Sequence, residues 1–120
     1  MSEKHIYDYS VSPDDNSAGA AILRMVGSGK KVFELGPGPG AITKPLKEQN
    51  QCEITSIEID PVAINLLRPY CECVFLGDLN SPTWAESIDS KTDFDVVVAG
   101  DVLEHLYDPL SVLKKAKGFI

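Results

Sequence analysis

The chain lacks the long hydrophobic runs that would take it into a membrane. Of its 120 residues, 43% are hydrophobic, but none of its apolar runs approaches the ~18 consecutive residues of a membrane helix. Residues 1–16 are polar and carry no signal-peptide pattern. We therefore expect no membrane partner.

Cysteine is scarce as well. Cys52, Cys71 and Cys73 are an odd number, and a single residue separates the last two, whereas zinc motifs use a two-residue spacer and a second pair. The predicted strands indicate that Cys52 and Cys73 are small, buried, apolar side chains. A disulfide framework and a metal site are not expected, and a reducing cytoplasm is the natural location.

Positive charge is in deficit. Eleven Lys and Arg residues stand against 18 Asp and Glu residues, and the net charge is −7. Only Lys30-Lys31 and the lysines of segment 114–117 come close to clustering, and a solvated helix face accounts for the second group. Because phosphate neutralisation needs clustered cations, we expect no nucleic-acid partner. The acidic balance suits a cationic ligand.

Apolar runs alternate with helical segments along the chain. Strands are predicted at 31–35, 53–58, 72–76 and 94–99, and helices at 17–26, 41–49, 61–70, 82–88 and 105–117. Strands joined by helical crossovers form a parallel sheet with helices on both faces. The prediction is one α/β domain over residues 17–120, preceded by an irregular lead-in at 1–16.

The most informative segment is Val32-Phe33-Glu34-Leu35-Gly36-Pro37-Gly38-Pro39-Gly40. A buried strand with one acidic residue ends at three glycines spaced two apart, and a helix follows. Glycines are needed where the backbone turns sharply or lets a ligand approach. Glu58 ends the next apolar run, about 20 residues on, where a ribose-binding carboxylate belongs.

This pattern resembles the class I S-adenosylmethionine-dependent methyltransferases. Their first motif, acidic-x-Gly-x-Gly-x-Gly, is matched by Glu34, Gly36, Gly38 and Gly40. Segments 56–61, 77–79 and 94–106 are similar to the later motifs, in the same order. The resemblance implies a Rossmann-like doubly wound parallel sheet with four strands in the order 3-2-1-4 and S-adenosyl-L-methionine as cofactor. Pro37, where relatives have a small residue or Cys, stiffens the turn.

The resemblance also implies a set of cofactor-binding residues. Gly36, Gly38 and Gly40 would approach the methionine and ribose portions, and Glu58 would accept hydrogen bonds from both ribose hydroxyls. Asp78 would accept from the adenine N6 amino group, and Ile59 and Leu79 would enclose the adenine. Simpler alternatives remain open: the glycines as a plain strand–helix turn without a ligand, Glu58 as a solvated strand-end carboxylate, Asp78 as a turn residue, and Glu34 as an acceptor for N–H groups of the glycine loop.

Asp101, Glu104 and His105 follow the fourth predicted strand, where relatives place groups near the methyl donor and acceptor. Three interpretations stay open. In the first, the string caps a helix and packs the cofactor side, as in relatives without a metal. In the second, Glu104-His105 supplies a general base. In the third, the three residues resemble a divalent-metal cluster of some small-RNA and quinone-biosynthesis O-methyltransferases. Those enzymes have Glu where this chain has the shorter Asp101.

Family members carry three further strands after the fourth one. We therefore expect the chain to be the cofactor-binding half of a longer methyltransferase domain, with the C-terminal strands missing. The strand at Val96–Val98 would then be an unpaired apolar edge. Self-association through this edge is expected.

The predicted activity is transfer of a methyl group to a small-molecule or glycan acceptor, at oxygen, with Tyr7 and Tyr9 of the lead-in as a candidate lid. Two other classes stay open. Gly36-x-Gly38-x-x-Ala41 also fits a dinucleotide-binding oxidoreductase, although prolines at 37 and 39 remove two N–H groups from its phosphate loop. The second is a non-catalytic module that binds the cofactor.

Overall fold

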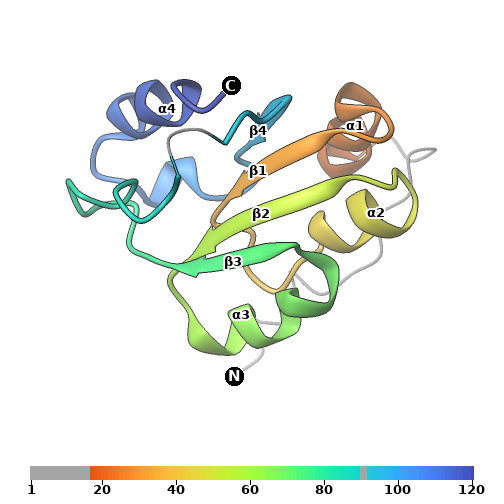
Figure 1. The fold of residues 1–120 in the computed structure, drawn as a ribbon, viewed down its shortest axis with the longest axis horizontal. Helices are drawn as coiled ribbons and strands as arrows, with labels where there is room; N and C mark the ends of the chain where they lie inside the picture. The colour runs from red at the N-terminus through yellow and green to blue at the C-terminus, as the bar shows by residue number, and fades with distance from the viewer. Residues whose placement is uncertain (1–16, 90–91) are drawn as a thin grey trace.

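Four parallel strands form the centre of the molecule in a computed structural model that describes residues 17–89 and 92–120. In chain order they are β1 (Lys31–Leu35), β2 (Glu53–Glu58), β3 (Cys73–Leu76) and β4 (Val96–Val98). Their order in the sheet is β3-β2-β1-β4 (Figure 1). The predicted fold and strand order are confirmed. β1 and β2 have the predicted bounds, and β3 and β4 are shorter than the predicted 72–76 and 94–99.

Short helices connect the strands: α1 (Ala18–Val26), α2 (Thr43–Glu48), α3 (Pro61–Leu67) with a 3₁₀ turn η2 (Arg68–Tyr70), a 3₁₀ turn η3 (Leu103–His105) and α4 (Pro109–Lys117). Three of them begin at a side-chain cap. Ser17 accepts from the Ala20 N–H at 3.1 Å, Asp60 from the Val62 N–H at 3.0 Å and Asp108 from the Ser111 N–H at 3.1 Å. Each cap satisfies an N–H that has no partner inside the helix.

Two helix predictions are wrong. The last helix begins at Pro109 rather than at residue 105, because Asp108 caps it and proline fits its first position. Residues 82–88 form turns instead of a helix. The N–H groups of Trp84, Glu86 and Ile88 donate to oxygens three residues back, at 3.1–3.3 Å, without a continuous helical ladder. Burial of Trp84 and Ile88 in the core holds this segment in place.

The two faces of the sheet carry separate apolar cores. On one face Phe33 stacks on Phe94, with ring centroids 5.0 Å apart, and contacts Phe119 edge-on at 5.6 Å. α4, residues 79–88 and Phe94 cover this face. On the other face Val32 and Ile54 pack against α1 and α2. Since side chains alternate along a strand, Glu34 points to the same face as Val32.

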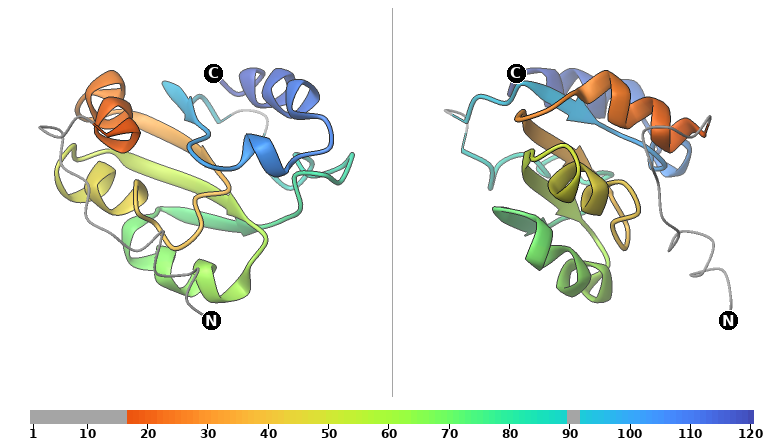
Figure 2. Two further views of the ribbon diagram at one scale, coloured as in Figure 1. Left: turned by 180° about the vertical axis from the view of Figure 1, so that it is seen from behind. Right: turned by 90° about the vertical axis from the view of Figure 1, so that its right-hand side faces the viewer.

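β3 and β4 are the two edges of the sheet (Figure 2). Within the described part of the chain, β4 pairs with β1 alone, as expected for the Val96–Val98 edge. Self-association through it stays a prediction. So does the division at residue 16, because the lead-in with Tyr7 and Tyr9 lies outside the described residues. In the same described part, no helix is long and apolar enough to span a bilayer.

The cysteines differ in exposure. Cys52 is buried, as predicted, but Cys73 is exposed because it begins the short edge strand β3. The prediction of a buried Cys73 is therefore wrong. Cys71 is half-buried with its Sγ 3.4 Å from the Ser56 Oγ, and burial is the main cause that raises the pKa of its thiol to about 11.

Candidate functional site

A cavity of about 400 Å³ opens at the carboxyl ends of the four strands, lined by the segments that follow each of them. This is the edge where ligands bind in open α/β sheets. The lining includes nine of the predicted site residues: Glu34, Gly36, Gly38, Glu58, Ile59, Asp78, Leu79, Asp101 and His105. Gly40 and Glu104 lie outside it.

The glycine loop after β1 turns in conformations that favour glycine. Gly36 has φ +57° and Gly38 has φ +60°. A Cβ at Gly36 would come within 2.4 Å of the Val102 Cγ2, so the loop packs directly on the segment after β4. Gly40 has φ +100°, and a Cβ there would lie 3.1 Å from the Leu67 side chain, so this glycine serves the turn rather than the cavity lining.

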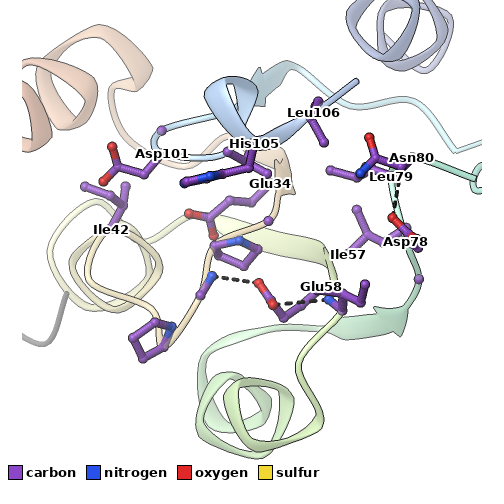
Figure 3. A pocket seen from close by; sticks show the side chains of 18 of the residues that line it. Glu34, Ile42, Ile57, Glu58, Asp78, Leu79, Asn80, Asp101, His105 and Leu106 are labelled. Carbon is purple, nitrogen blue, oxygen red and sulfur yellow. Dashed lines mark hydrogen bonds between the residues drawn. The ribbon is translucent and has the colours of Figure 1, made fainter. Parts of the chain in front are cut away.

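Glu58 links this loop to the end of β2 by a hydrogen bond. Its Oε1 accepts from the Gly38 N–H at 2.7 Å, and its Oε2 accepts from the Ile59 N–H at 3.1 Å (Figure 3). The same Oε2 also accepts from the Asp60 N–H at 3.0 Å. A carboxylate has about four acceptor sites, so one remains free, on Oε1. Glu58 is thus a bonded loop anchor rather than a merely solvated carboxylate. Its predicted bond to both ribose hydroxyls stays a prediction.

Glu34 lies in the cavity wall with 2% of its surface exposed. It accepts a hydrogen bond from the Oγ1 of Thr43, which is fully buried at the start of α2. Burial raises the pKa of Glu34 to about 7; the Thr43 bond opposes this shift and the Glu58 charge adds to it. The alternative in which Glu34 accepts from glycine-loop N–H groups is not what the structure describes. Thr43 was missed, although a polar residue after a glycine turn could have indicated it.

At the other end of the cavity, Asp78 forms a local turn. Its Oδ1 accepts from the Asn80 N–H at 2.9 Å, which leaves the second oxygen for a ligand. Leu79 is buried in the core as well as lining the cavity, whereas Ile59 is 59% exposed. Asn80 was not predicted: its Oδ1 accepts from the Tyr107 N–H at 2.9 Å and joins the segments after β3 and β4.

Asp101 and His105 lie near Glu34 and Ile42 at the opposite end from Asp78 (Figure 3). Both side chains are exposed. Within residues 17–89 and 92–120, no three His, Cys, Asp or Glu side chains are grouped closely enough to hold a metal ion, so the metal-cluster interpretation has no geometric support there. The string does not cap α4, because Asp108 does so. The packing part of that interpretation agrees with the structure, since Val102 and Leu106 pack against the core and line the cavity.

The cavity has a strongly acidic lining. Glu34, Glu58, Asp78 and Asp101 contribute to it, and none of its described lining residues is Lys or Arg. Such a site favours a ligand with positive charge. S-adenosylmethionine, with its sulfonium and ammonium groups, has that character.

A family model described as a methyltransferase domain matches residues 13–119. The chain belongs to the S-adenosylmethionine-dependent methyltransferase family. The cofactor of this family is S-adenosylmethionine, as predicted. The match favours this family over a dinucleotide-binding oxidoreductase.

Individual relatives agree with this assignment. The chain is 38% identical over 73 residues to "Probable ribosomal RNA small subunit methyltransferase A" of Pyrobaculum islandicum, covering 58% of this chain and 31% of that protein. It is 26% identical over 98 residues to a ubiquinone biosynthesis O-methyltransferase of Actinobacillus pleuropneumoniae, covering 77% and 42%. A TehB-like S-adenosylmethionine-dependent methyltransferase from Corynebacterium glutamicum superposes with a TM-score of 0.51 at 29% identity, covering 71% and 45%.

The chain therefore spans less than half the length of these relatives. The relative named for ribosomal RNA also means that the expected absence of a nucleic-acid partner stays a prediction.

Proposed function

We propose that this protein transfers the methyl group of S-adenosylmethionine to an oxygen atom of a small-molecule or glycan acceptor. The observation that carries the proposal is the acidic cavity at the carboxyl ends of the strands, with a carboxylate after each of β3 and β4, one at the end of β2 and one inside β1. An assay of methyl transfer distinguishes this proposal from a non-catalytic cofactor-binding module.

The cofactor would extend across the cavity. The adenine would lie between Ile59 and Leu79, near the free oxygen of Asp78, and one ribose hydroxyl would donate to Glu58. The methionine half would then reach the end formed by Glu34, Asp101 and His105. This arrangement matches each part of the ligand to a group of suitable polarity.

In the reaction, the acceptor oxygen attacks the methyl carbon, the carbon–sulfur bond breaks, and S-adenosylhomocysteine leaves as a neutral thioether. Alignment of oxygen, carbon and sulfur supplies most of the acceleration. The exposed His105 imidazole at the methionine end would accept the proton of the acceptor hydroxyl. Asp101 would orient the acceptor by accepting a hydrogen bond.

Two observations support a small acceptor. One relative is named as an O-methyltransferase of ubiquinone biosynthesis. The cavity lining holds four acidic side chains and, among the described residues, no Lys or Arg to contact phosphates. The relative named for ribosomal RNA makes RNA the alternative acceptor that the assay must include.

The first test is calorimetric titration with S-adenosylhomocysteine, with NAD⁺ as the competing ligand class. We expect binding of the former alone and at least tenfold weaker binding in Glu58→Gln, because the change places an amide N–H₂ among three N–H donors. Glu53→Gln, at the exposed opposite end of the same strand, is the matched control and should bind normally. Binding of NAD⁺ instead would refute the cofactor assignment.

The acceptor is tested by transfer of labelled methyl from S-adenosylmethionine to phenols, sugars and RNA in parallel. Label in a phenol or sugar supports the proposal, and label in RNA alone contradicts it. His105→Ala should keep cofactor affinity and lose transfer. Equal transfer by His105→Ala would exclude the general-base role.

A further inference from the structure

Asn80 joins the two loops that form opposite ends of the cavity. It follows β3 and lines the cavity, and its Oδ1 accepts a hydrogen bond from the Tyr107 N–H at 2.9 Å. Tyr107 lies two residues beyond His105, in the segment after β4. Since 27 positions separate Asn80 from Tyr107, this bond belongs to the tertiary fold and not to a local turn. The Asp78 end of the cavity is therefore connected to the end that carries His105.

A compact turn fixes the position of Asn80. The Asp78 Oδ1 accepts from the Asn80 N–H at 2.9 Å, and the Asp78 carbonyl oxygen accepts from the Ser81 N–H at 2.9 Å (Figure 3). Leu79, between Asp78 and Asn80 in the chain, is buried in the core. Because Asp78 and Asn80 belong to one turn, a ligand that binds the second Asp78 oxygen also restricts the Asn80 side chain.

The segment after β4 packs on the core through apolar side chains. Val102 and Leu106 contact the core, and the His105 N–H donates locally, to the Val102 oxygen at 3.0 Å. Apolar contacts are non-directional, whereas a hydrogen bond has a preferred distance and angle. The Asn80 bond is thus a directional contact that sets the position of His105 relative to the Asp78 end.

We propose that Asn80 is a positioning residue, which transmits occupancy of the Asp78 end of the cavity to segment 101–107 through its bond to the Tyr107 N–H. An adenosine group at Asp78 restricts the turn at 78–81, and Asn80 in turn restricts the Tyr107 backbone. His105 is then held in place before the acceptor binds. This inference rests on the proposed function, because it requires adenosine at the Asp78 end, and it is independent of the acceptor.

The expected size of the effect is that of one hydrogen bond between neutral groups. Such a bond changes a local opening equilibrium about twofold to tenfold, and amide hydrogen exchange measures this equilibrium residue by residue. In the native protein, a bound ligand should slow exchange of the His105 and Tyr107 amides within this range. Asn80→Leu and Asn80→Ala have no acceptor and should lose the slowing. Asn80→Asp keeps an oxygen acceptor and should retain it.

The test is amide hydrogen exchange, followed by NMR, with and without S-adenosylhomocysteine or 5′-methylthioadenosine. The second ligand lacks the amino-acid portion, so its effect on His105 has to pass through the protein. Lys115→Met is the matched control, because it deletes a second link between the segment after β3 and the segment after β4. That link is the 2.8 Å bond from the Lys115 Nζ to the Pro82 oxygen, and neither residue lines the cavity. Lys115→Met should retain the slowing.

A merely structural bond predicts that exchange in Asn80→Leu is faster by the same factor with and without ligand, and this result would overturn the inference. Binding to the native protein without slower exchange at His105 and Tyr107 would overturn it too. So would loss of the slowing in Asn80→Asp or Lys115→Met, because the acceptor oxygen of Asn80 would then not be the cause. These results leave ligand binding in place and are distinct from a failure of the proposed function. Absence of binding by both ligands would overturn both.

Discussion

Replacing Glu34 by Gln should stabilise the protein at high pH and change little at low pH. The carboxyl is 2% exposed, and burial raises its pKa from 4.5 to about 7. The folded state thus binds more protons than the unfolded state between these two values. Stability of the native protein falls as the pH rises through this interval, and the full cost is present above pH 7.

The size of this cost follows from the shift. A difference of about 2.5 pKa units corresponds to about 3 kcal/mol at pH 8, falling to about 1 kcal/mol at pH 5. The glutamine side chain keeps an oxygen that accepts from Thr43 and has no charge to bury. We therefore expect Glu34→Gln to gain about 2 kcal/mol more at pH 8 than at pH 5.

Urea unfolding at the two pH values measures this difference directly. Glu53→Gln removes an exposed carboxylate from the same sheet and should show no comparable pH dependence. The reasoning is refuted if Glu34→Gln is no more stable than the native protein at pH 8. A gain of equal size at both values would also refute it, because the cost would then come from packing and not from charge.

Two further predictions concern the glycine loop and the cysteines. Gly36→Ala should destabilise the fold by about 2–4 kcal/mol in urea unfolding, because φ is +57° and Val102 occupies the space for a Cβ. Gly38→Ala should lower the stability by only about 1–2 kcal/mol, because φ is +60° but the space around a Cβ is open. Equal losses of stability in the two variants would contradict the role of the Val102 contact. N-ethylmaleimide at pH 7 should modify the exposed Cys73 well before Cys71, because burial raises the pKa of the Cys71 thiol to about 11. Mass spectrometry of the peptides measures the order of modification, and faster modification of Cys71 would contradict the prediction.

Much of the fold could be predicted because the decisive signals are local. β1 and β2 are apolar runs ended by a glycine turn and by Asp60-Pro61, and both have the predicted bounds. Their crossover helices require parallel pairing. The 82–88 segment could not be predicted in this way. Its proline and helix-forming residues favour a helix locally. Its turns depend instead on a tertiary contact, because the Trp84 ring lies 6.3 Å from the Phe33 ring between centroids.

The candidate site could likewise be predicted only where its signals are local. Carboxylates at strand ends could be predicted to meet, since parallel strands deliver them to one edge of the sheet. Their partners could not, because the bonds of Glu58 to Gly38 and of Asn80 to Tyr107 join residues 20 and 27 positions apart. The exposure of Cys73 depends on β3 being an edge, which the run of apolar residues does not reveal.

Glu34 lowers the stability of the empty fold when it ionises in this cavity. A neutral side chain at this position would accept the Thr43 hydrogen bond without the cost of burying a charge. The chain instead keeps an ionisable group in the cavity wall, next to a second carboxylate and, among the described lining residues, with no Lys or Arg. Such a cost is typical of functional sites. A bound ligand with positive charge would offset this cost, because an opposite charge nearby favours the ionised form of a carboxyl group.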